Sequence, residues 1–134
     1  MKILGMDIGD KRIGIAITDK DRKLSIPHSV INNDRSFEQN LDRILEEDII
    51  EKIVVGMPYT LKGEIGKQGK KVIDFVDKYI INNGIEIIYM DERFTSKIPM
   101  NTSINKKKIK KQIDKHSAVL ILQSYLDRIS KVNK

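Results

Sequence analysis

The first third of the chain has the alternation of apolar and polar positions that is typical of β-strands. Residues 3–8 form a short apolar run, and residues 12–18 alternate isoleucines with smaller side chains at a period of two. The Gly-Asp-Lys sequence between them predicts a hairpin-like turn. Residues 23–31 predict a third strand, and Pro27 within it favours an edge position. An antiparallel meander of three strands is therefore expected.

Apolar residues then recur at helical spacing. Ser36 is expected to begin a helix, with Gln39 three residues later completing a capping box. The residues expected to form the apolar stripe of this helix are Phe37, Leu41, Ile44 and Leu45. A continuous apolar run at 52–58 follows, as expected for a strand that is covered on both faces.

The same order of helix and strand is repeated in the second half of the chain. A second helix is expected to have Gly84 as its C-cap, and its predicted inward residues are Val72, Val76, Tyr79 and Ile80. Residues 85–90 predict another buried strand, and a last helix is expected to begin near Asp114. The order β-β-β-α-β-α-β-α predicts an α/β fold with a five-stranded mixed sheet flanked by helices. It combines the three-stranded meander with two parallel strands, which is the order of the ribonuclease H-like fold.

Composition limits the classes of protein to which the chain can belong. Its 134 residues, 40% hydrophobic and 33% charged, suit one domain spanning 1–134. No apolar run is long enough to cross a membrane, and the first residues lack the apolar core of a signal peptide. The absence of cysteine excludes disulfides, thiolate metal sites and a thiol nucleophile. We expect a cytoplasmic enzyme or binding protein.

The net positive charge is concentrated in one short segment. Residues 106–115 hold six lysines and one aspartate, which accounts for +5 of the chain's net charge of +6. A basic patch of this kind suits a nucleic-acid partner, because neutralised phosphates release condensed counterions. The alternative is a solvated lysine-rich surface that aids solubility.

Three carboxylates occupy ends of predicted elements where apolar residues would be expected. Asp7 closes the first strand, Glu92 follows the last strand, and Asp114 precedes the apolar stripe of the last helix. A buried carboxylate without a partner is costly, so each would need a cation, a metal or several hydrogen bonds. If the three converge at one edge of the sheet, they form an oxygen-rich site suited to Mg²⁺ or Mn²⁺.

Each of these acids also has an ordinary structural interpretation. Asp7 could cap the following turn, because Asp-x-Gly is common turn chemistry. Asp91 and Glu92 could be surface residues paired with Arg93, and Asp114 could be the N-cap of the last helix.

The opening motif also has a rival interpretation. An aspartate followed by glycines on a strand–turn–strand is shared with actin-like kinases and chaperone ATPases, in which the glycines admit nucleotide phosphates. Those proteins close two large domains over the nucleotide. A chain of 134 residues cannot supply the second one.

Four blocks of sequence resemble the YqgF/RuvX family, whose members are named as Holliday-junction resolvases or pre-16S rRNA nucleases. The blocks span nearly the whole chain in family order and read GMDIGDKRIGIAITD at 5–19, VVGMPYTLKGEIG at 54–66, DERFTS at 91–96 and IDKHSAVLILQSYLD at 113–127. The resemblance implies a ribonuclease H-like fold and a hydrolase that cleaves phosphodiester bonds with Mg²⁺ or Mn²⁺.

The resemblance also implies roles for individual residues. The catalytic and metal-binding acids of the family fall on Asp7, Glu92 and Asp114. Gly9 and Gly14 would leave the turn open for a phosphate, while Gly56 and Pro58 match the end of the family's fourth strand. Lys11 and Arg12 would hold the nucleic-acid backbone or support the hairpin. On the charge of the basic segment, and not on the resemblance, the further residues expected to contact nucleic acid are Lys106, Lys107, Lys108, Lys110 and Lys111. His28 and His116 are expected to be structural or surface residues.

One segment departs from the family pattern. Family members usually carry a longer, helical stretch where this chain has residues 94–111, and Pro99 there predicts a loop. The segment bears on substrate choice, and three functions stay open. The first is processing of the 5′ end of pre-16S rRNA, by a monomer or a homodimer. The second is resolution of branched DNA junctions. The third is RNA binding in ribosome assembly without catalysis.

Overall fold

The computed structural model describes residues 1–92 and 106–132, with side chains described from residue 117 to 130 in the last helix. The elements are β1 (Lys2–Ile8), β2 (Arg12–Thr18), β3 (Ser25–Asn32), α1 (Phe37–Glu47), β4 (Ile50–Met57), α2 (Lys67–Tyr79), the 3-10 turn η1 (Ile81–Asn83), β5 (Glu86–Asp91) and α3 (Lys106–Val132). No helix in these ranges is long and apolar enough to cross a membrane.

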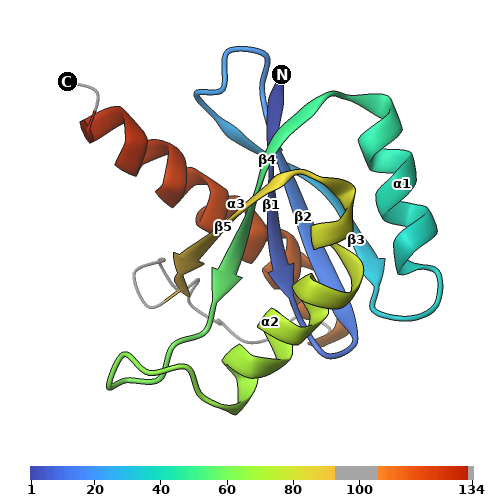
Figure 1. The fold of residues 1–134 in the computed structure, drawn as a ribbon, viewed down its shortest axis with the longest axis vertical. Helices are drawn as coiled ribbons and strands as arrows, with labels where there is room; N and C mark the ends of the chain where they lie inside the picture. Colours follow the sequence, from blue (N-terminus) through green and yellow to red (C-terminus); the bar gives the residue numbers. More distant parts are fainter. Residues whose placement is uncertain (93–105, 133–134) are drawn as a thin grey trace.

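The strands form one sheet in the order β3-β2-β1-β4-β5. β1 pairs antiparallel with β2, and β2 pairs antiparallel with β3. β4 runs parallel to both β1 and β5, so these three strands end at the same edge of the sheet (Figure 1). The predicted mixed sheet and the edge position of the strand with Pro27 are confirmed.

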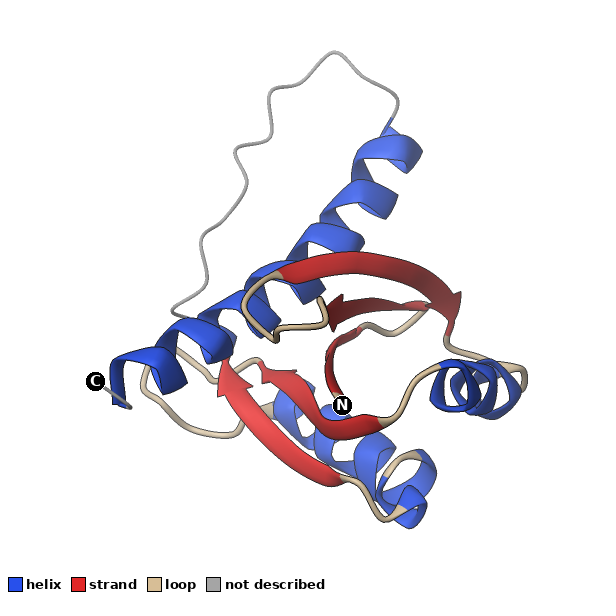
Figure 2. Cartoon of the chain, turned by 90° about the horizontal axis from the view of Figure 1, so that it is seen from above, coloured by secondary structure: helices blue, strands red, loops and turns tan. Residues whose placement is uncertain are grey.

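Helices cover both faces of the sheet. α1 and α2 pack on one face around Leu4 and Met6 of β1, and α3 crosses the other face, where it packs on Ile3 (Figure 2). Gly5 lies under α3, because a Cβ added there would be 2.7 Å from Cβ of Leu122. Since side chains alternate along a strand, Asp7 belongs to the face that α3 covers.

The apolar stripes of the helices are formed by the predicted residues, but the capping box predicted at Ser36 does not form. Ser36 has helical backbone angles and makes no side-chain cap bond. Asp34 instead accepts the backbone N–H of Ser36 at 2.8 Å and its hydroxyl at 2.5 Å. Asp34 thereby binds the backbone N–H that Gln39 would bind in a capping box.

Gly84 also has a different role from the one predicted. α2 ends at Tyr79 with Ile80 as its C-cap, and η1 follows directly. Gly84 ends η1 with a positive φ of 72°, so it caps the short turn and not the α-helix. The Asn83 side chain donates to the carbonyl of Ile80 at 3.1 Å, which stabilises this extra turn.

α3 begins eight residues earlier than expected. Its helical backbone starts at Lys106, so the predictions of a start near Asp114 and of a loop through residue 111 are wrong. Lysine is a good helix former, and no glycine or proline interrupts residues 106–132. The rest of the predicted loop, up to residue 105, lies outside the described residues.

Candidate active site

Asp7 lies near the end of the central strand, on the face that α3 covers. It is half-buried, and its register partner on β2 is Gly14. Because the partner has no side chain, the space beside the Asp7 carboxylate on β2 is not filled by that residue. The prediction for Asp7 as a site residue therefore has a suitable position in the fold.

Glu92 reaches the same place from the edge of the sheet. It follows β5, which is separated from β1 by β4. Its side chain passes over Gly56 of β4, where an added Cβ would collide with Oε1 of Glu92 and lie 2.5 Å from Cδ1 of Ile121. A glycine at this point of β4 thus leaves the room that lets Glu92 extend toward Asp7.

The two carboxyl groups share a hydrogen bond. Burial, the nearby charge of Asp7, the hydrogen bond to Asp7 and the charge of Asp91 together raise the pKa of Glu92 to about 8, with burial the largest cause. Two carboxylates in contact cannot both ionise at low cost, so the pair retains a proton at neutral pH. A cation bound between them would replace that proton. The paired oxygens match the ligands that Mg²⁺ and Mn²⁺ prefer.

Asp114 is the third predicted acid, and its side chain lies outside the described residues. Its backbone is well inside α3, eight residues after the helix begins, so its interpretation as an N-cap is wrong. It lies one turn before Ala118, whose carbonyl oxygen would be 3.0 Å from a Cβ at Gly5. Among the described side chains, no group of three potential metal ligands is found. The convergence of all three acids stays a prediction.

The turn between β1 and β2 borders the carboxylate pair. Gly9 donates its N–H to the carbonyl of Arg12 at 2.9 Å, and a Cβ at Gly9 would lie 2.7 Å from that oxygen. Glycine is therefore required by the tightness of the turn itself. Lys11 is exposed and Arg12 is half-buried. Gly14, in contrast, is buried within β2, so of the two glycines only Gly9 lies in the turn.

The remaining site predictions fall into two groups. The side chains of Lys106, Lys107, Lys108, Lys110 and Lys111 lie outside the described residues, as do those of Arg93 and His116. His28 is described: its Nδ1 is 2.9 Å from the hydroxyl of Ser29, and its Nε2 is 3.8 Å from Glu47. Those contacts fit the structural role expected for His28.

Two residues were missed as contributors to the site. Asn33 braces the turn, because its amide donates to the carbonyl of Gly9 at 2.9 Å and its N–H donates to that of Lys11 at 2.9 Å. No sequence signal marks such a long-range contact. Gly56 was matched only to a strand end, although a glycine inside an apolar strand already indicates that another group approaches closely.

Comparison with known proteins identifies the family. The sequence model of the family described as "RuvX: Holliday junction resolvase" matches residues 1–128. The chain belongs to the RuvX family. Members of this family are enzymes that hydrolyse phosphodiester bonds.

Curated RuvX relatives match over nearly the whole chain. A protein of Sulfurihydrogenibium sp. named "Putative pre-16S rRNA nuclease" is 44% identical, over 99% of this chain and 94% of its own length. A protein of the same name from Desulforudis audaxviator is 39% identical, over 95% of this chain and 94% of its own length.

Solved structures share the RuvX chain's fold at low sequence identity. The T. thermophilus RuvC complex with a Holliday junction substrate has a TM-score of 0.58 and 11% identity, over 97% of this chain and 96% of its own. The Fowlpox virus resolvase complex with Holliday junction DNA has a TM-score of 0.57 and 18% identity, over 96% of this chain and 99% of its own. The fold is therefore ribonuclease H-like.

Proposed function

We propose that residues 1–134 form a single nuclease domain that uses divalent metal ions to cleave structured RNA at the 5′ end of pre-16S rRNA. The observation that carries the proposal is the contact between two half-buried carboxyl groups, Asp7 on β1 and Glu92 directly after β5, although β1 and β5 are not neighbours in the sheet. Bringing two acids together costs free energy, because one of them must stay protonated, and a bound cation would remove that cost. The names of the curated relatives supply the RNA substrate.

Asp7 and Glu92 are the residues that would hold Mg²⁺ or Mn²⁺, and Asp114 is proposed as a third ligand. All three offer carboxylate oxygens, which are the preferred ligands of these hard cations. When bound, the ions supply charge for activating a water and for stabilising the departing 3′ oxygen. In their absence, the Glu92 carboxyl keeps a proton in its hydrogen bond with Asp7.

Basic and glycine residues around the pair would orient the substrate. The turn at Gly9 brings backbone close to the edge where β1 ends, and exposed Lys11 is next to it. The lysine-rich start of α3 would add contacts with phosphates that do not depend on sequence. Such contacts give affinity, whereas the carboxylate pair supplies the chemistry.

Cleavage of four-way DNA junctions is the second candidate. It is favoured by the family description and by the fold shared with two structures that hold Holliday junctions. Symmetric cutting of a junction needs two active sites related by a twofold axis. A protein that sediments only as a monomer, in the presence and absence of junction DNA, would rule this candidate out.

The proposal is tested by incubating the protein with a labelled pre-16S 5′ fragment and, in parallel, a four-way DNA junction, each with Mn²⁺. Asp7→Asn and Glu92→Gln should each slow RNA cleavage at least about 100-fold, since each removes a negative ligand. Asp10→Asn is the matched control, because Asp10 is an exposed acid in the same turn, 3.6 Å from Lys71.

Calorimetry with Mn²⁺ separates loss of metal from loss of fold. Binding should be seen in the unmodified protein and in Asp10→Asn, and should be lost in Asp7→Asn. If neither substrate is cleaved and the Asp7→Asn protein binds RNA with unchanged affinity, the chain acts as an RNA-binding protein and the nuclease proposal is wrong.

A further inference from the structure

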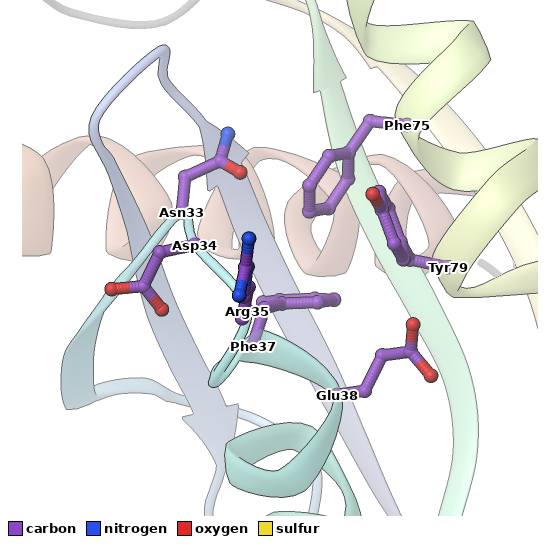
Figure 3. A pocket seen from close by; sticks show the side chains of 7 residues that line it. All are labelled: Asn33, Asp34, Arg35, Phe37, Glu38, Phe75 and Tyr79. Atoms are coloured by element: carbon purple, nitrogen blue, oxygen red, sulfur yellow. The ribbon is translucent and has the colours of Figure 1, made fainter.

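A pocket of about 430 Å³ is lined by residues of α1 and α2 and of the segment before α1 (Figure 3). Because α1 and α2 cover one face of the sheet and α3 the other, the pocket and the carboxylate pair lie on opposite faces. The pocket opens between the start of α1 and the side of α2. It is at the same end of the sheet as Asp7. Asn32 at the end of β3 pairs with Arg12 at the start of β2, and the start of β2 lies beside the end of β1, where Asp7 is. Asn33 lines the pocket and also bonds the turn beside the carboxylates. One residue thus links the pocket to the candidate active site.

Aromatic rings form one wall of this pocket. Phe37, Phe75 and Tyr79 are three of the chain's seven aromatic residues. Phe37 is buried and packs edge-on against Phe75 at 4.8 Å between ring centroids, and the Phe75 and Tyr79 centroids are 5.0 Å apart. Phe75 and Tyr79 are only half-buried, so parts of their rings remain open to a ligand.

Polar groups surround the aromatic wall. Arg35 is exposed, lines the pocket and lies beside Phe37 (Figure 3). Asp34 and Glu38 also line the pocket. Hydrogen bonds from Ser36 lower the pKa of Asp34, so this group is an ionised acceptor at neutral pH. The lining therefore combines flat stacking surfaces with several acceptors and one cation.

We propose that this pocket binds one unpaired nucleobase of the substrate, with guanine favoured over the other bases. Aromatic rings and guanidinium planes are the surfaces on which proteins stack splayed-out bases. Guanine presents the most N–H donors on its pairing edge, which suits the carboxylate of Glu38 near Tyr79 (Figure 3). The volume falls within the roughly 300–1,000 Å³ of small-ligand sites. This inference rests on the proposed function, because it requires a nucleic-acid substrate.

A base held in the pocket would direct its backbone over the turn toward Asp7. The amide of Asn33 holds the carbonyl of Gly9, two residues after Asp7. A strand that places one base on the α1 and α2 face would therefore cross the turn on its way to the carboxylates. The pocket would select an unpaired guanine near the cleaved bond, which phosphate contacts cannot do.

The test uses the Asp7→Asn protein in EDTA, so that binding is measured without metal and without cleavage. The probes are the RNAs UUUGUUU, UUUAUUU and UUUUUUU, and a version of the first with an abasic site in place of guanine. Ring resonances of Phe75 and Tyr79 are followed by NMR. The guanine RNA should shift both rings and bind at least about fivefold more tightly than the others.

Matched variants assign the effect to the pocket. Glu38→Gln should reduce the guanine preference at least about fivefold. Arg35→Gln should weaken binding of every RNA whose base enters the pocket, because stacking does not distinguish the bases. Arg43→Gln and Glu46→Gln, exposed residues of α1 outside the pocket, should change neither. Equal binding of the guanine and abasic RNAs overturns the inference. Ring shifts produced by N-acetylarginine amide, and not by RNA, overturn it in favour of a protein partner. Neither outcome depends on whether the unmodified enzyme cleaves RNA.

Discussion

At the scale of single residues, the candidate site depends on Gly56, which has no side chain. The Glu92 side chain occupies the space where a Cβ of residue 56 would be. An acid at the edge of the sheet can therefore approach an acid on the central strand across an intervening strand. The close contact has a cost, since it buries Glu92 beside a second carboxyl group.

Gly56→Ala should weaken both folding and metal binding. The new methyl group would meet Glu92 and Ile121, and overpacking of this kind costs about 1–3 kcal/mol. Urea unfolding measures the loss, and Mn²⁺ calorimetry measures the displacement of Glu92. In a double-mutant cycle with Glu92→Ala, part of the destabilisation should disappear. Strict additivity would show that the two residues are not in contact.

The pKa of Glu92 predicts how metal-free stability depends on pH. The group has a pKa of about 8 in the folded protein and an ordinary value of 4.5. Between these values the folded state holds a proton that the unfolded state has released, so stability should fall as pH rises from about 5 to 8.

Urea unfolding in EDTA at several pH values checks this prediction. Glu92→Gln should flatten the slope in that interval, because glutamine does not titrate. Glu38→Gln, at an exposed acid far from the pair, is the control and should leave the slope unchanged. A slope that persists in Glu92→Gln would show that other groups cause it.

At the scale of elements, the start of α1 shows how a neighbouring residue can replace an expected cap. Asp34 accepts two hydrogen bonds from Ser36, while the Ser36 hydroxyl makes no cap bond to the helix. Asp34→Ala should therefore lower the urea midpoint more than Ser36→Ala does. The opposite ranking would show that Ser36 caps the helix, as the sequence predicted.

The destabilisation caused by Asp34→Ala should also become smaller at low pH. The pKa of Asp34 is lowered in the folded protein, so this group stabilises the fold only while it is ionised.

The long α3 joins two segments that the sequence pattern separated. Its second half packs on the sheet through Ala118, Ile121 and Leu122, and its lysine-rich start is continuous helix with that half. A helical start holds the lysine backbone in fixed relation to the carboxylate pair, which a loop would not.

Replacing Lys110 and Lys111 with Gln should weaken RNA binding and reduce its dependence on salt. Each lost phosphate contact lowers the slope of log affinity against log salt by about 0.7–0.9. Fluorescence anisotropy at several salt concentrations measures this slope. Lys20→Gln with Lys23→Gln is the control, since these exposed lysines lie at the opposite end of the sheet. Equal effects from both pairs would show that only net charge matters.

At the scale of the whole molecule, the two faces of the sheet carry different chemistry around one turn. The α3 face has the carboxylate pair, and the α1 and α2 face has the aromatic pocket. Asn33 and the backbone of residues 9–12 lie between them. This arrangement allows one strand of substrate to contact both faces.

Mn²⁺ should stabilise the folded protein as a whole. A ligand that binds only the folded state adds about 2.7 kcal/mol at 100 times its dissociation constant. Thermal unfolding should therefore shift upward with Mn²⁺ concentration in the unmodified protein and in Asp10→Asn, but not in Asp7→Asn. A shift of equal size in Asp7→Asn would place the metal elsewhere.

The sequence by itself determined the order of elements, the edge strand and the apolar stripes of the helices. These features are local: the spacing of apolar residues and the restriction at Pro27 act within one element. It also singled out Asp7 and Glu92, because acids at the ends of apolar strands are conspicuous.

Only the tertiary structure decided how distant residues meet. The passage of Glu92 over Gly56 and the bond from Asn33 to Gly9 each join segments far apart in the chain. The gathering of Phe37, Phe75 and Tyr79 beside Arg35 is of the same kind. Such contacts depend on strand order and helix placement, which the packing of the whole core sets and no local pattern encodes.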